Sequence, residues 1–251
     1  CDGNVGMVGA SYVGYVQWQA ATMGSKYLKA IVPRVIGHNM YEVAFRQGGA
    51  LGLAVSAMWA LRYDGRTRQE IFGYNWDQLF RSLPLIDLDR AAGKDVPFFR
   101  DWITHPDYDD YWRAQSIEER YQDIGIPVLQ IGGWYDLLVN GTFHNFTGMR
   151  EHGGSELARA NHRAIVGPWI HTLNNPGEMD FGRSSSLDFR EIELKWFDHW
   201  LKGEDNGVER EAPLRIFVMG TNEWRDEQEW PLARTQFTPY YLHSGGEANS
   251  L

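Results

Sequence analysis

Four short runs of consecutive apolar residues alternate along this chain with longer stretches of mixed polarity. A run of this length, bounded by glycine or turn residues, is typical of a strand buried on both faces of a parallel sheet. Residues 12–24 have the spacing of an amphipathic helix, with Val16, Ala20 and Met23 on its inward face. Strand, helix and strand in succession predict a parallel α/β sheet. The predicted strands are residues 5–8, 28–35, 126–131 and 163–166.

The chain between residues 41 and 122 follows a different pattern. Its apolar residues, many of them Trp and Phe, have amphipathic spacing and are interrupted by Pro84, Pro97 and Pro106. No stretch shows the alternation of a half-buried strand. We therefore expect residues 41–122 to form a helical cap that is inserted into the α/β core.

The last part of the chain is predicted to leave the α/β core. A helix over residues 186–201 precedes Gly203, and a charged linker follows. Two short apolar segments, residues 214–219 and 240–242, then lie on either side of a turn, as in the strands of a β-sandwich. The predicted organisation is a core in two parts, residues 1–40 and 123–203, with the cap between them and the start of a β-sandwich at residues 204–251.

Composition and charge argue against several classes of binding partner. Of the 251 residues, 43% are hydrophobic and 23% are charged, as in ordinary packed globular proteins. The formal net charge of -9 argues against nucleic acid or an anionic membrane surface, because both require clustered Lys and Arg. No apolar run approaches the roughly 20 residues of a membrane span.

The single cysteine, Cys1, allows no internal disulfide. We expect a cytoplasmic protein. Because the sequence begins with Cys1 and enters a predicted core strand almost at once, we interpret it as a fragment and leave a secretion signal open.

Residues 3–14 place a serine in a sharp turn between an apolar run and a helix. Ser11 lies between Gly9 and Gly14, whose missing side chains would let the helix pack closely on the preceding strand. This is the pattern of a nucleophile elbow, which exposes a serine hydroxyl at the edge of a sheet. Val13 occupies the second glycine position of the usual Gly-x-Ser-x-Gly form. The pattern alone therefore leaves open a turn serine without chemistry.

Two further polar residues follow predicted strands. Asp136 comes after residues 126–131, and His171 comes after residues 163–166. Because parallel strands end at one edge of a sheet, both are expected near Ser11. A serine hydroxyl needs a histidine to take its proton and an acid to orient the imidazole. The chain order Ser11, Asp136, His171 is that of the α/β-hydrolases, and we predict these three residues as a catalytic triad.

Other kinds of site receive little support from the sequence. The chain has no His-Glu-x-x-His, no paired cysteines and no EF-hand loop, so we predict no metal. The glycines at positions 3, 6 and 9 do not form the fingerprint of a dinucleotide site, and no cofactor is expected. His38 also follows a predicted strand and is a candidate for the substrate pocket, together with Trp134 and Trp169.

Several stretches resemble the cocaine esterase and Xaa-Pro dipeptidyl-peptidase family of serine hydrolases. In that family the nucleophile elbow has the sequence Gly-x-Ser-Tyr-x-Gly. Its second glycine lies one position later than usual, as Gly14 does here. The resemblance covers most of the chain. It implies an α/β-hydrolase core with a helical cap and a C-terminal jelly roll, of which residues 204–251 would be the beginning. The stretches that carry it are residues 1–14, 17–21, 105–112, 132–136, 167–171 and 196–203.

The resemblance implies a role for each candidate residue. Ser11 is the nucleophile, His171 is the general base and then acid, and Asp136 is its orienting partner. The backbone N–H of Tyr12 is one oxyanion donor, worth roughly 3 kcal/mol of transition-state stabilisation. The family's second donor is a tyrosine hydroxyl from an earlier strand, which has no counterpart in this sequence.

The resemblance leaves the substrate open between esters and peptides. Our first hypothesis is a serine hydrolase that cleaves carboxylic esters through an acyl-enzyme, and our second is a dipeptidyl-peptidase that acts on Xaa-Pro N-termini. The family's amino-acid ester hydrolases hold the ammonium group of the substrate with carboxylates, two of which come just after the catalytic aspartate. This chain has Leu138 and Val139 at those positions, which argues against an amino-acid ester hydrolase. Our third hypothesis is a scaffold or carbohydrate-binding protein that has the hydrolase fold but no catalytic activity. The expected partner is a small ester or a short peptide, and a homo-oligomer stays open.

Overall fold

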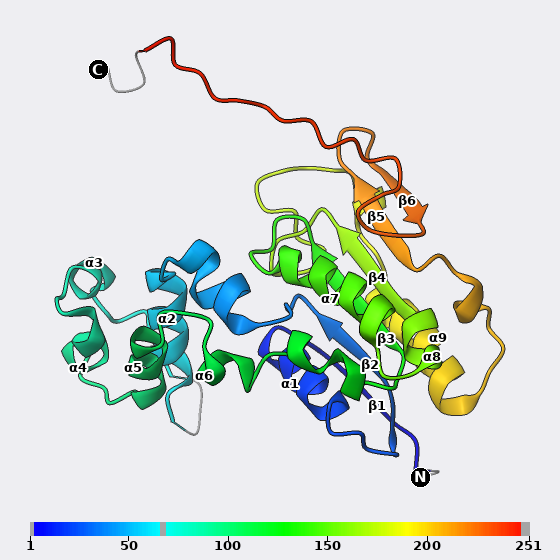
Figure 1. Ribbon diagram of the computed structural model, residues 1–251, viewed down its shortest axis with the longest axis horizontal. Coiled ribbons are helices and arrows are strands. Elements are labelled where there is room, and N and C mark those ends of the chain that lie inside the picture. Colours follow the sequence, from blue (N-terminus) through cyan, green and yellow to red (C-terminus); the bar gives the residue numbers. More distant parts are fainter. Residues whose placement is uncertain (1–2, 66–68, 247–251) are drawn as a thin grey trace.

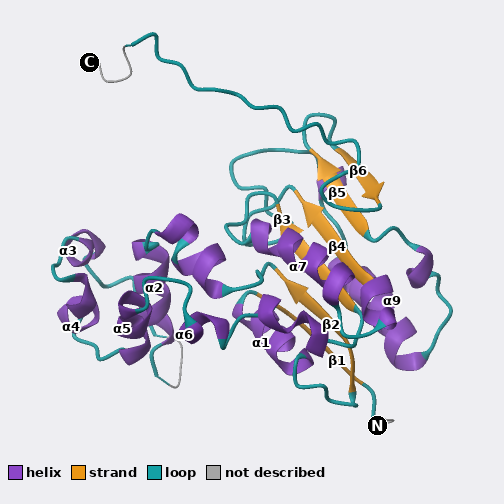
Figure 2. Ribbon diagram, viewed as in Figure 1, coloured by secondary structure: helices purple, strands orange, loops and turns teal. Residues whose placement is uncertain are grey.

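The computed structural model describes residues 3–65 and 69–246, and these residues form a six-stranded sheet with helices on both faces (Figure 1, Figure 2). The strands lie side by side in chain order. The first five are parallel, and the last is antiparallel to its neighbour. Sequence and structure therefore agree on a mostly parallel α/β sheet. The strands are β1 (Val5–Ala10), β2 (Leu28–Arg34), β3 (Val128–Gly133), β4 (His162–Gly167), β5 (Leu214–Val218) and β6 (Glu223–Glu227).

The two faces of the sheet are covered by different helices. Successive side chains of β2 point to opposite faces, as the pleat of a strand requires. Ile31 packs in one cluster with Trp18 of α1 and Met149 of α7, and Val32 packs in another with Trp196 of α9. Each helix thus buries its apolar side chains against one face of the sheet. The helices of the core are α1 (Tyr12–Ala21), α7 (Val139–His152), α8 (Glu156–Ala160) and α9 (Phe189–Lys202).

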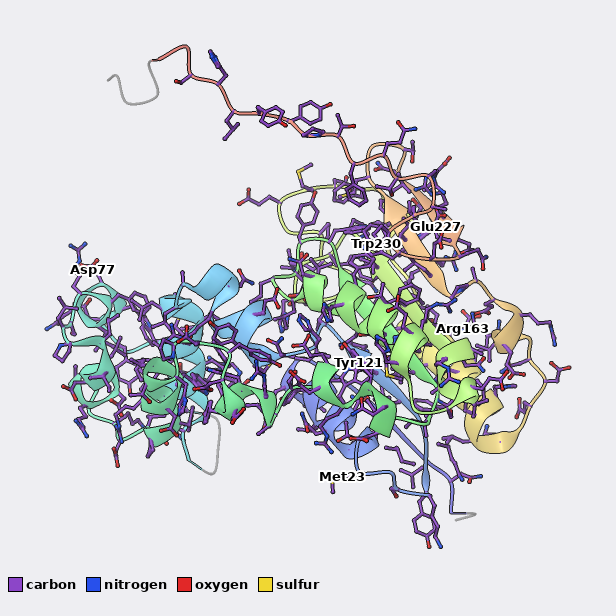
Figure 3. All side chains as sticks on the ribbon, viewed as in Figure 1. Met23, Asp77, Tyr121, Arg163, Glu227 and Trp230 are labelled. Carbon is purple, nitrogen blue, oxygen red and sulfur yellow. The ribbon has the colours of Figure 1, made fainter. Side chains whose placement is uncertain are left out.

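α1 packs through a different face from the one expected. Met23 lies beyond the end of the helix, is 75% exposed and points away from the core (Figure 3), whereas Trp18 is fully buried. A side chain at Gly14 would lie 3.1 Å from the carbonyl oxygen of Arg34, so this glycine lets α1 approach β2 closely. Gly14, Trp18 and Ala21 share one face by their spacing and turn that face to the sheet.

The cap forms a second lobe between β2 and β3, on the left of Figure 1. Its described residues form helices and loops and include no strand. The interior is aromatic, with the rings of Phe45 and Trp102 stacked at 4.1 Å and Trp59 and Trp112 packed against them. The segments of the cap are a π-helix (Tyr41–Phe45), η2 (Gln47–Gly49), α2 (Leu53–Tyr63), α3 (Trp76–Phe80), η3 (Leu85–Asp87), α4 (Leu88–Ala91), α5 (Pro97–Thr104), α6 (Asp110–Arg113) and η4 (Glu118–Asp123).

The C-terminal strands differ from the expectation of a separate layer. β5 pairs with β4 and β6 pairs with β5, so both extend the sheet of the core. Residues 240–242, expected as a strand, belong to none. The domain boundaries drawn from the sequence stay predictions. Among the residues described here, no helix combines the length and apolar character needed to cross a bilayer.

Candidate active site

Ser11 occupies the sharp turn between β1 and α1. Its φ of 58° and ψ of -129° are strained values for a residue with a side chain. Its backbone N–H donates to the carbonyl oxygen of Arg34 at 2.8 Å, which ties the turn to the end of β2. A Cβ atom at Gly9 would lie 2.5 Å from Cγ1 of Val13, so the strand and the helix can meet this closely only around glycine. The turn presents the serine hydroxyl at the carboxyl edge of the sheet.

The side chains of Ser11, His171 and Asp136 form a continuous chain of hydrogen bonds. His171 Nε2 lies 2.9 Å from Ser11 Oγ, and its Nδ1 lies 2.9 Å from Asp136 Oδ1. The carboxylate also accepts the backbone N–H of Leu138 at 3.2 Å. The side chain of Asp136 is 1% exposed and that of His171 is 39% exposed. A neutral imidazole with its proton on Nδ1 can accept the serine proton at Nε2.

The loops after β3 and β4 hold the histidine and the aspartate at a fixed separation. Gly133 ends β3, and a Cβ atom there would lie 2.2 Å from the carbonyl oxygen of Trp169. The same carbonyl accepts the N–H of Tyr135 at 2.9 Å. Backbone contacts therefore join the loop that carries Asp136 to the loop that carries His171.

The start of α1 lies directly beside the serine. Tyr12 is the first residue of α1, so its N–H has no acceptor within the helix. A free amide at a helix N-terminus is suited to stabilise an oxyanion. The ring of Tyr12 lies 5.6 Å from that of Trp59, which brings cap helix α2 to the elbow.

The three side chains expected in a substrate pocket differ in their burial and contacts, and their role stays a prediction. Trp169 is fully buried, and its indole N–H donates to the carbonyl oxygen of Ser185, so it belongs to the core and offers no surface to a substrate. Trp134 is half-buried and stacks on Phe143, with ring centroids 5.2 Å apart. His38 is buried and faces two carboxylates of the cap.

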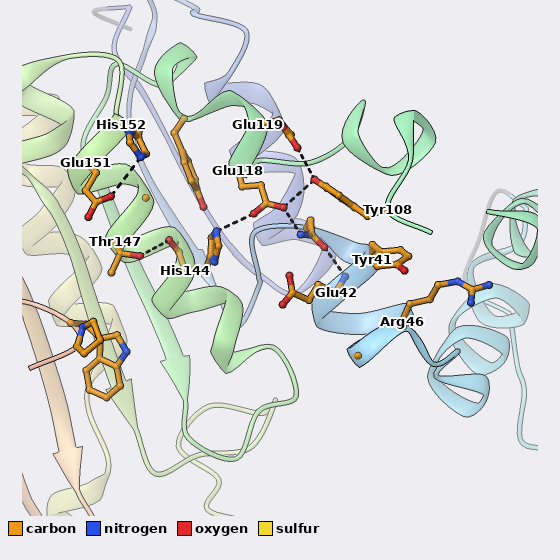
Figure 4. A pocket seen from close by; sticks show the side chains of 17 residues that line it. Tyr41, Glu42, Arg46, Tyr108, Glu118, Glu119, His144, Thr147, Glu151 and His152 are labelled. Carbon is orange, nitrogen blue, oxygen red and sulfur yellow. Dashed lines mark hydrogen bonds and ion pairs between the residues drawn. The ribbon is translucent and has the colours of Figure 1, made fainter. Parts of the chain in front are cut away.

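The structure also brings together residues that the sequence did not single out. Glu118 and His144 meet beside His38, and one ligand atom from each lies within 4.8 Å of the others. They adjoin a cleft of about 960 Å³ between the π-helix of the cap, η4 and α7, part of whose lining is seen in Figure 4. The triad residues are not among those that line this cleft. Because the three side chains come from distant segments, no local motif could have predicted their meeting.

Charge interactions within this cluster are strong. Burial raises the pKa of Glu118, but the hydrogen bond from His144, the nearby His38 and the amide of Asn39 lower it to about 2. Burial and the neighbouring His144 lower the pKa of His38. The hydrogen bond to Glu118 raises the pKa of His144. Near neutral pH the cluster therefore contains an ionised carboxylate and a neutral buried imidazole.

Family models match two parts of the chain. The model described as X-Pro dipeptidyl-peptidase (S15 family) matches residues 1–173. The model of the X-Pro dipeptidyl-peptidase C-terminal non-catalytic domain matches residues 206–251. The first match alone covers more than half of the chain.

Two curated relatives extend well beyond this sequence. The chain is 33% identical over 277 residues to cocaine esterase of Rhodococcus sp. (strain MB1 Bresler), covering 100% of this chain and 46% of the relative. It is 25% identical over 236 residues to a putative Xaa-Pro dipeptidyl-peptidase of Bacillus anthracis, covering 91% of this chain and 34% of the relative. The chain thus spans less than half the length of these relatives.

A solved structure shows the same fold. The aminopeptidase from a marine sediment archaeon, Thaumarchaeota archaeon, superposes with a TM-score of 0.70 at 20% identity, covering 92% of this chain and 39% of that one. At this identity the likeness establishes the fold alone, and it confirms the predicted α/β class. The family model over residues 1–173 and the identity to cocaine esterase establish more: the chain belongs to the X-Pro dipeptidyl-peptidase (S15) family.

Proposed function

We propose that the protein containing this chain is a serine hydrolase that cleaves carboxylic esters through an acyl-enzyme intermediate. The observation that carries the proposal is the hydrogen-bond chain from Ser11 through His171 to Asp136, with 2.9 Å at both links of the imidazole. The strained backbone of Ser11 and the free N–H of Tyr12 beside it support the same chemistry.

Acylation begins with transfer of the Ser11 proton to His171. As Nε2 takes this proton, Oγ forms a bond to the ester carbonyl carbon, and the carbonyl electron pair moves onto oxygen. The N–H of Tyr12 donates to this oxyanion. The tetrahedral intermediate then collapses, the bond to the alcohol oxygen breaks, and the leaving alcohol takes the proton from Nε2 of His171.

Deacylation repeats the same steps with water. His171 takes a proton from the water, whose oxygen attacks the acyl carbon, and Ser11 leaves with the proton returned from Nε2. Throughout, the buried carboxylate of Asp136 stabilises the imidazolium and keeps the proton on Nδ1. A carboxylic acid and an alcohol are the products.

Xaa-Pro dipeptidyl-peptidase activity is the second candidate, because the matching family model carries that description. Such a substrate brings a free ammonium group close to the reacting carbonyl, and this group needs a carboxylate as partner. The residues directly after Asp136 are Leu137, Leu138 and Val139, and Leu137 is 45% exposed. An apolar surface here favours a neutral acyl group.

Labelling with a fluorophosphonate tests the proposed nucleophile without knowledge of the substrate. We expect one covalent adduct, located by mass spectrometry on Ser11, and none in Ser11→Ala or His171→Ala. Ser184→Ala is the matched control, because Ser184 is exposed and should leave labelling unchanged. An adduct on another serine, or no adduct on a folded protein, would refute the triad and favour the non-catalytic hypothesis.

A substrate comparison separates the two enzymatic candidates. Aryl esters with neutral acyl groups are assayed beside Xaa-Pro aryl amides, so that both kinds of substrate release an aromatic leaving group. The ester proposal requires a higher kcat/KM for the esters and no measurable turnover of the amides. Efficient release of Xaa-Pro dipeptides would instead establish the peptidase.

A further inference from the structure

Donor atoms of three side chains converge beside the cleft between cap and core. His38 follows β2, Glu118 begins η4, and His144 lies on α7. Nε2 of His144 lies 3.0 Å from Oε2 of Glu118, and Nε2 of His38 lies 3.7 Å from the same oxygen. Figure 4 shows the side chains of Glu118 and His144 directed toward each other. Two imidazoles and one carboxylate are a common donor set for Zn²⁺.

The carboxylate of Glu118 is held with one oxygen turned to the imidazoles. Its Oε1 accepts hydrogen bonds from Asn39 Nδ2 at 2.5 Å and from the hydroxyl of Tyr108 at 3.0 Å. Its Oε2 faces His38 and His144. Hydrogen bonds that orient a carboxylate in this way are typical of the groups behind a metal ligand.

The two imidazoles are arranged to share one partner. Their rings are stacked, with centroids 3.9 Å apart and planes 15° apart, and both direct Nε2 toward Glu118. Nε2 of His38 also lies 3.3 Å from Oε2 of Glu42. One neutral imidazole N–H cannot satisfy two carboxylates, and a cation between them would interact with both.

The cleft gives a cation a route to these groups. Glu42, Glu118 and His144 line it, together with the acidic residues Glu119 and Glu151. Several carboxylates at one opening raise the local concentration of cations. An entry path is one of the features that a proposed metal site must have.

We propose that this cluster binds Zn²⁺, with Nε2 of His38, Nε2 of His144 and Oε2 of Glu118 as ligands and Glu42 or a water in the fourth position. Tetrahedral coordination with bonds near 2.0 Å places ligand atoms roughly 3.3 Å apart, so the 3.7 Å separation of His38 from Glu118 must shorten slightly and the 3.0 Å separation of His144 from Glu118 must lengthen slightly. The exposed fractions of the His144 and Glu42 side chains, 49% and 64%, allow such movement. The metal would join the end of β2, the end of the cap and α7. The proposed zinc site does not depend on the proposed ester chemistry.

Calorimetric titration of Zn²⁺ into the chelator-treated protein tests the site. We expect one equivalent of Zn²⁺ to bind, because the three ligand atoms lie within 4.8 Å of one another and form one site. Changes behind a ligand cost about 10–100-fold in affinity, so removing a ligand in His144→Gln should cost at least about 100-fold. His152→Gln is the matched control, because His152 lies on the same helix and pairs with Glu151 instead.

Two further variants locate the bound zinc within the protein. His171→Gln must retain binding, because zinc could otherwise occupy the proposed triad. Glu42→Gln changes an exposed side chain and should weaken binding less than His144→Gln does. Co²⁺ in place of Zn²⁺ should give the intense visible absorption of tetrahedral coordination, and circular dichroism checks that each variant is folded. Equal affinity in wild type and His144→Gln, loss of binding in His171→Gln, or no stoichiometric binding would overturn the proposal.

Discussion

At the scale of single residues, the carboxylate of Asp136 combines burial with few partners. Its Oδ1 meets both His171 and the N–H of Leu138. Its Oδ2 is buried without a hydrogen-bond partner among the described residues. The carboxylate therefore interacts mainly with the imidazole of His171. The attraction between the two groups is strongest when that imidazole is protonated.

Replacing Asp136 with Asn should remove this effect while keeping the shape of the side chain. Without the carboxylate, His171 loses the partner that keeps its proton on Nδ1. We expect kcat for an ester substrate to fall by about 10⁴-fold, the order seen when the acid of a triad becomes an amide. The matched control is Glu178→Gln, an exposed change on the loop after His171 that should leave kcat unchanged. A loss smaller than tenfold would contradict the assigned role.

His162 is a second residue whose environment sets a measurable property. It is fully buried in β4, and burial, followed by the charge of Arg150, lowers its pKa to about 3. Nε2 of His162 lies 2.8 Å from the amide nitrogen of Gln130, which can donate only to an unprotonated imidazole. Protonation would place two donors face to face.

The low pKa of His162 predicts a loss of stability in acid. The unfolded imidazole titrates near pH 6.5, so between about pH 6.5 and pH 3 the unfolded state binds more protons than the folded one. The free energy of unfolding should fall by about 1.4 kcal/mol for each pH unit in the lower part of this range. His162→Leu should lower the overall stability but flatten this acid slope, whereas His152→Gln should keep it. Urea unfolding at several pH values measures the slope, and an unchanged slope in His162→Leu would exclude His162 as its source.

Some single residues could be predicted from the sequence, and others could not. Ser11, Asp136 and His171 each follow a recognisable strand, so topology alone predicted that they would meet. Glu118 and His144 follow no strand, and their approach depends on how the cap returns to the core. Trp169 follows a strand like the triad residues, yet its large apolar ring is packed in the core.

At the scale of elements, the contact between the ends of β3 and β4 sets the geometry of the site. Gly133 touches the carbonyl oxygen of Trp169 through backbone atoms, which cannot rotate aside as a side chain can. Any atom added there must move one of the two loops. The distance between Asp136 and His171 is thus sensitive to a residue that does no chemistry.

Gly133→Ala should therefore weaken both stability and activity. The added Cβ would lie 2.2 Å from that oxygen, and overpacking of this kind costs about 1–3 kcal/mol. We expect a lower Tm and slower fluorophosphonate labelling of Ser11. Gly73→Ala is the matched control, because no atom lies within 4 Å of its added Cβ. Normal labelling in folded Gly133→Ala would show that the two loops adjust independently of the site.

Strands differed in how well the sequence predicted them. β2, β3 and β4 are buried on both faces and appear as apolar runs. β6 was missed because its residues, Glu223–Glu227, are mostly polar and lie at an edge of the sheet. α9 begins where Asp188 accepts the N–H groups of Arg190 and Glu191, later than its apolar spacing indicated.

At the scale of the whole molecule, Trp59 joins the cap to the elbow. Its ring lies 5.6 Å from Tyr12 and 5.7 Å from Trp102, so one side chain contacts both the start of α1 and the aromatic interior of the cap. This ring contact is one of several between the cap and α1.

Trp59→Ala should weaken substrate binding but change the reactivity of Ser11 little. We expect a KM for aryl esters that is raised several-fold, with a loss of stability of about 2–3 kcal/mol for a half-buried tryptophan. Labelling of Ser11 by a small fluorophosphonate should continue at the wild-type rate. Trp76→Ala is the control, since its ring packs on Tyr74 and Phe80 within the cap, away from the elbow. If both variants raise KM equally, the effect comes from general loosening of the cap.

The cap leaves the core after β2 and returns to it before β3, and these two strands are neighbours in the sheet. Their pairing, Ile31 with Val128 and Arg34 with Ile131, is made entirely by core residues. The cap is thus inserted between two neighbouring strands of the sheet. We expect changes in the length and aromatic lining of the cap to leave this pairing in place, and with it the alignment of Ser11, Asp136 and His171. Exchange of the cap should therefore alter the choice of substrate without altering the proposed triad chemistry.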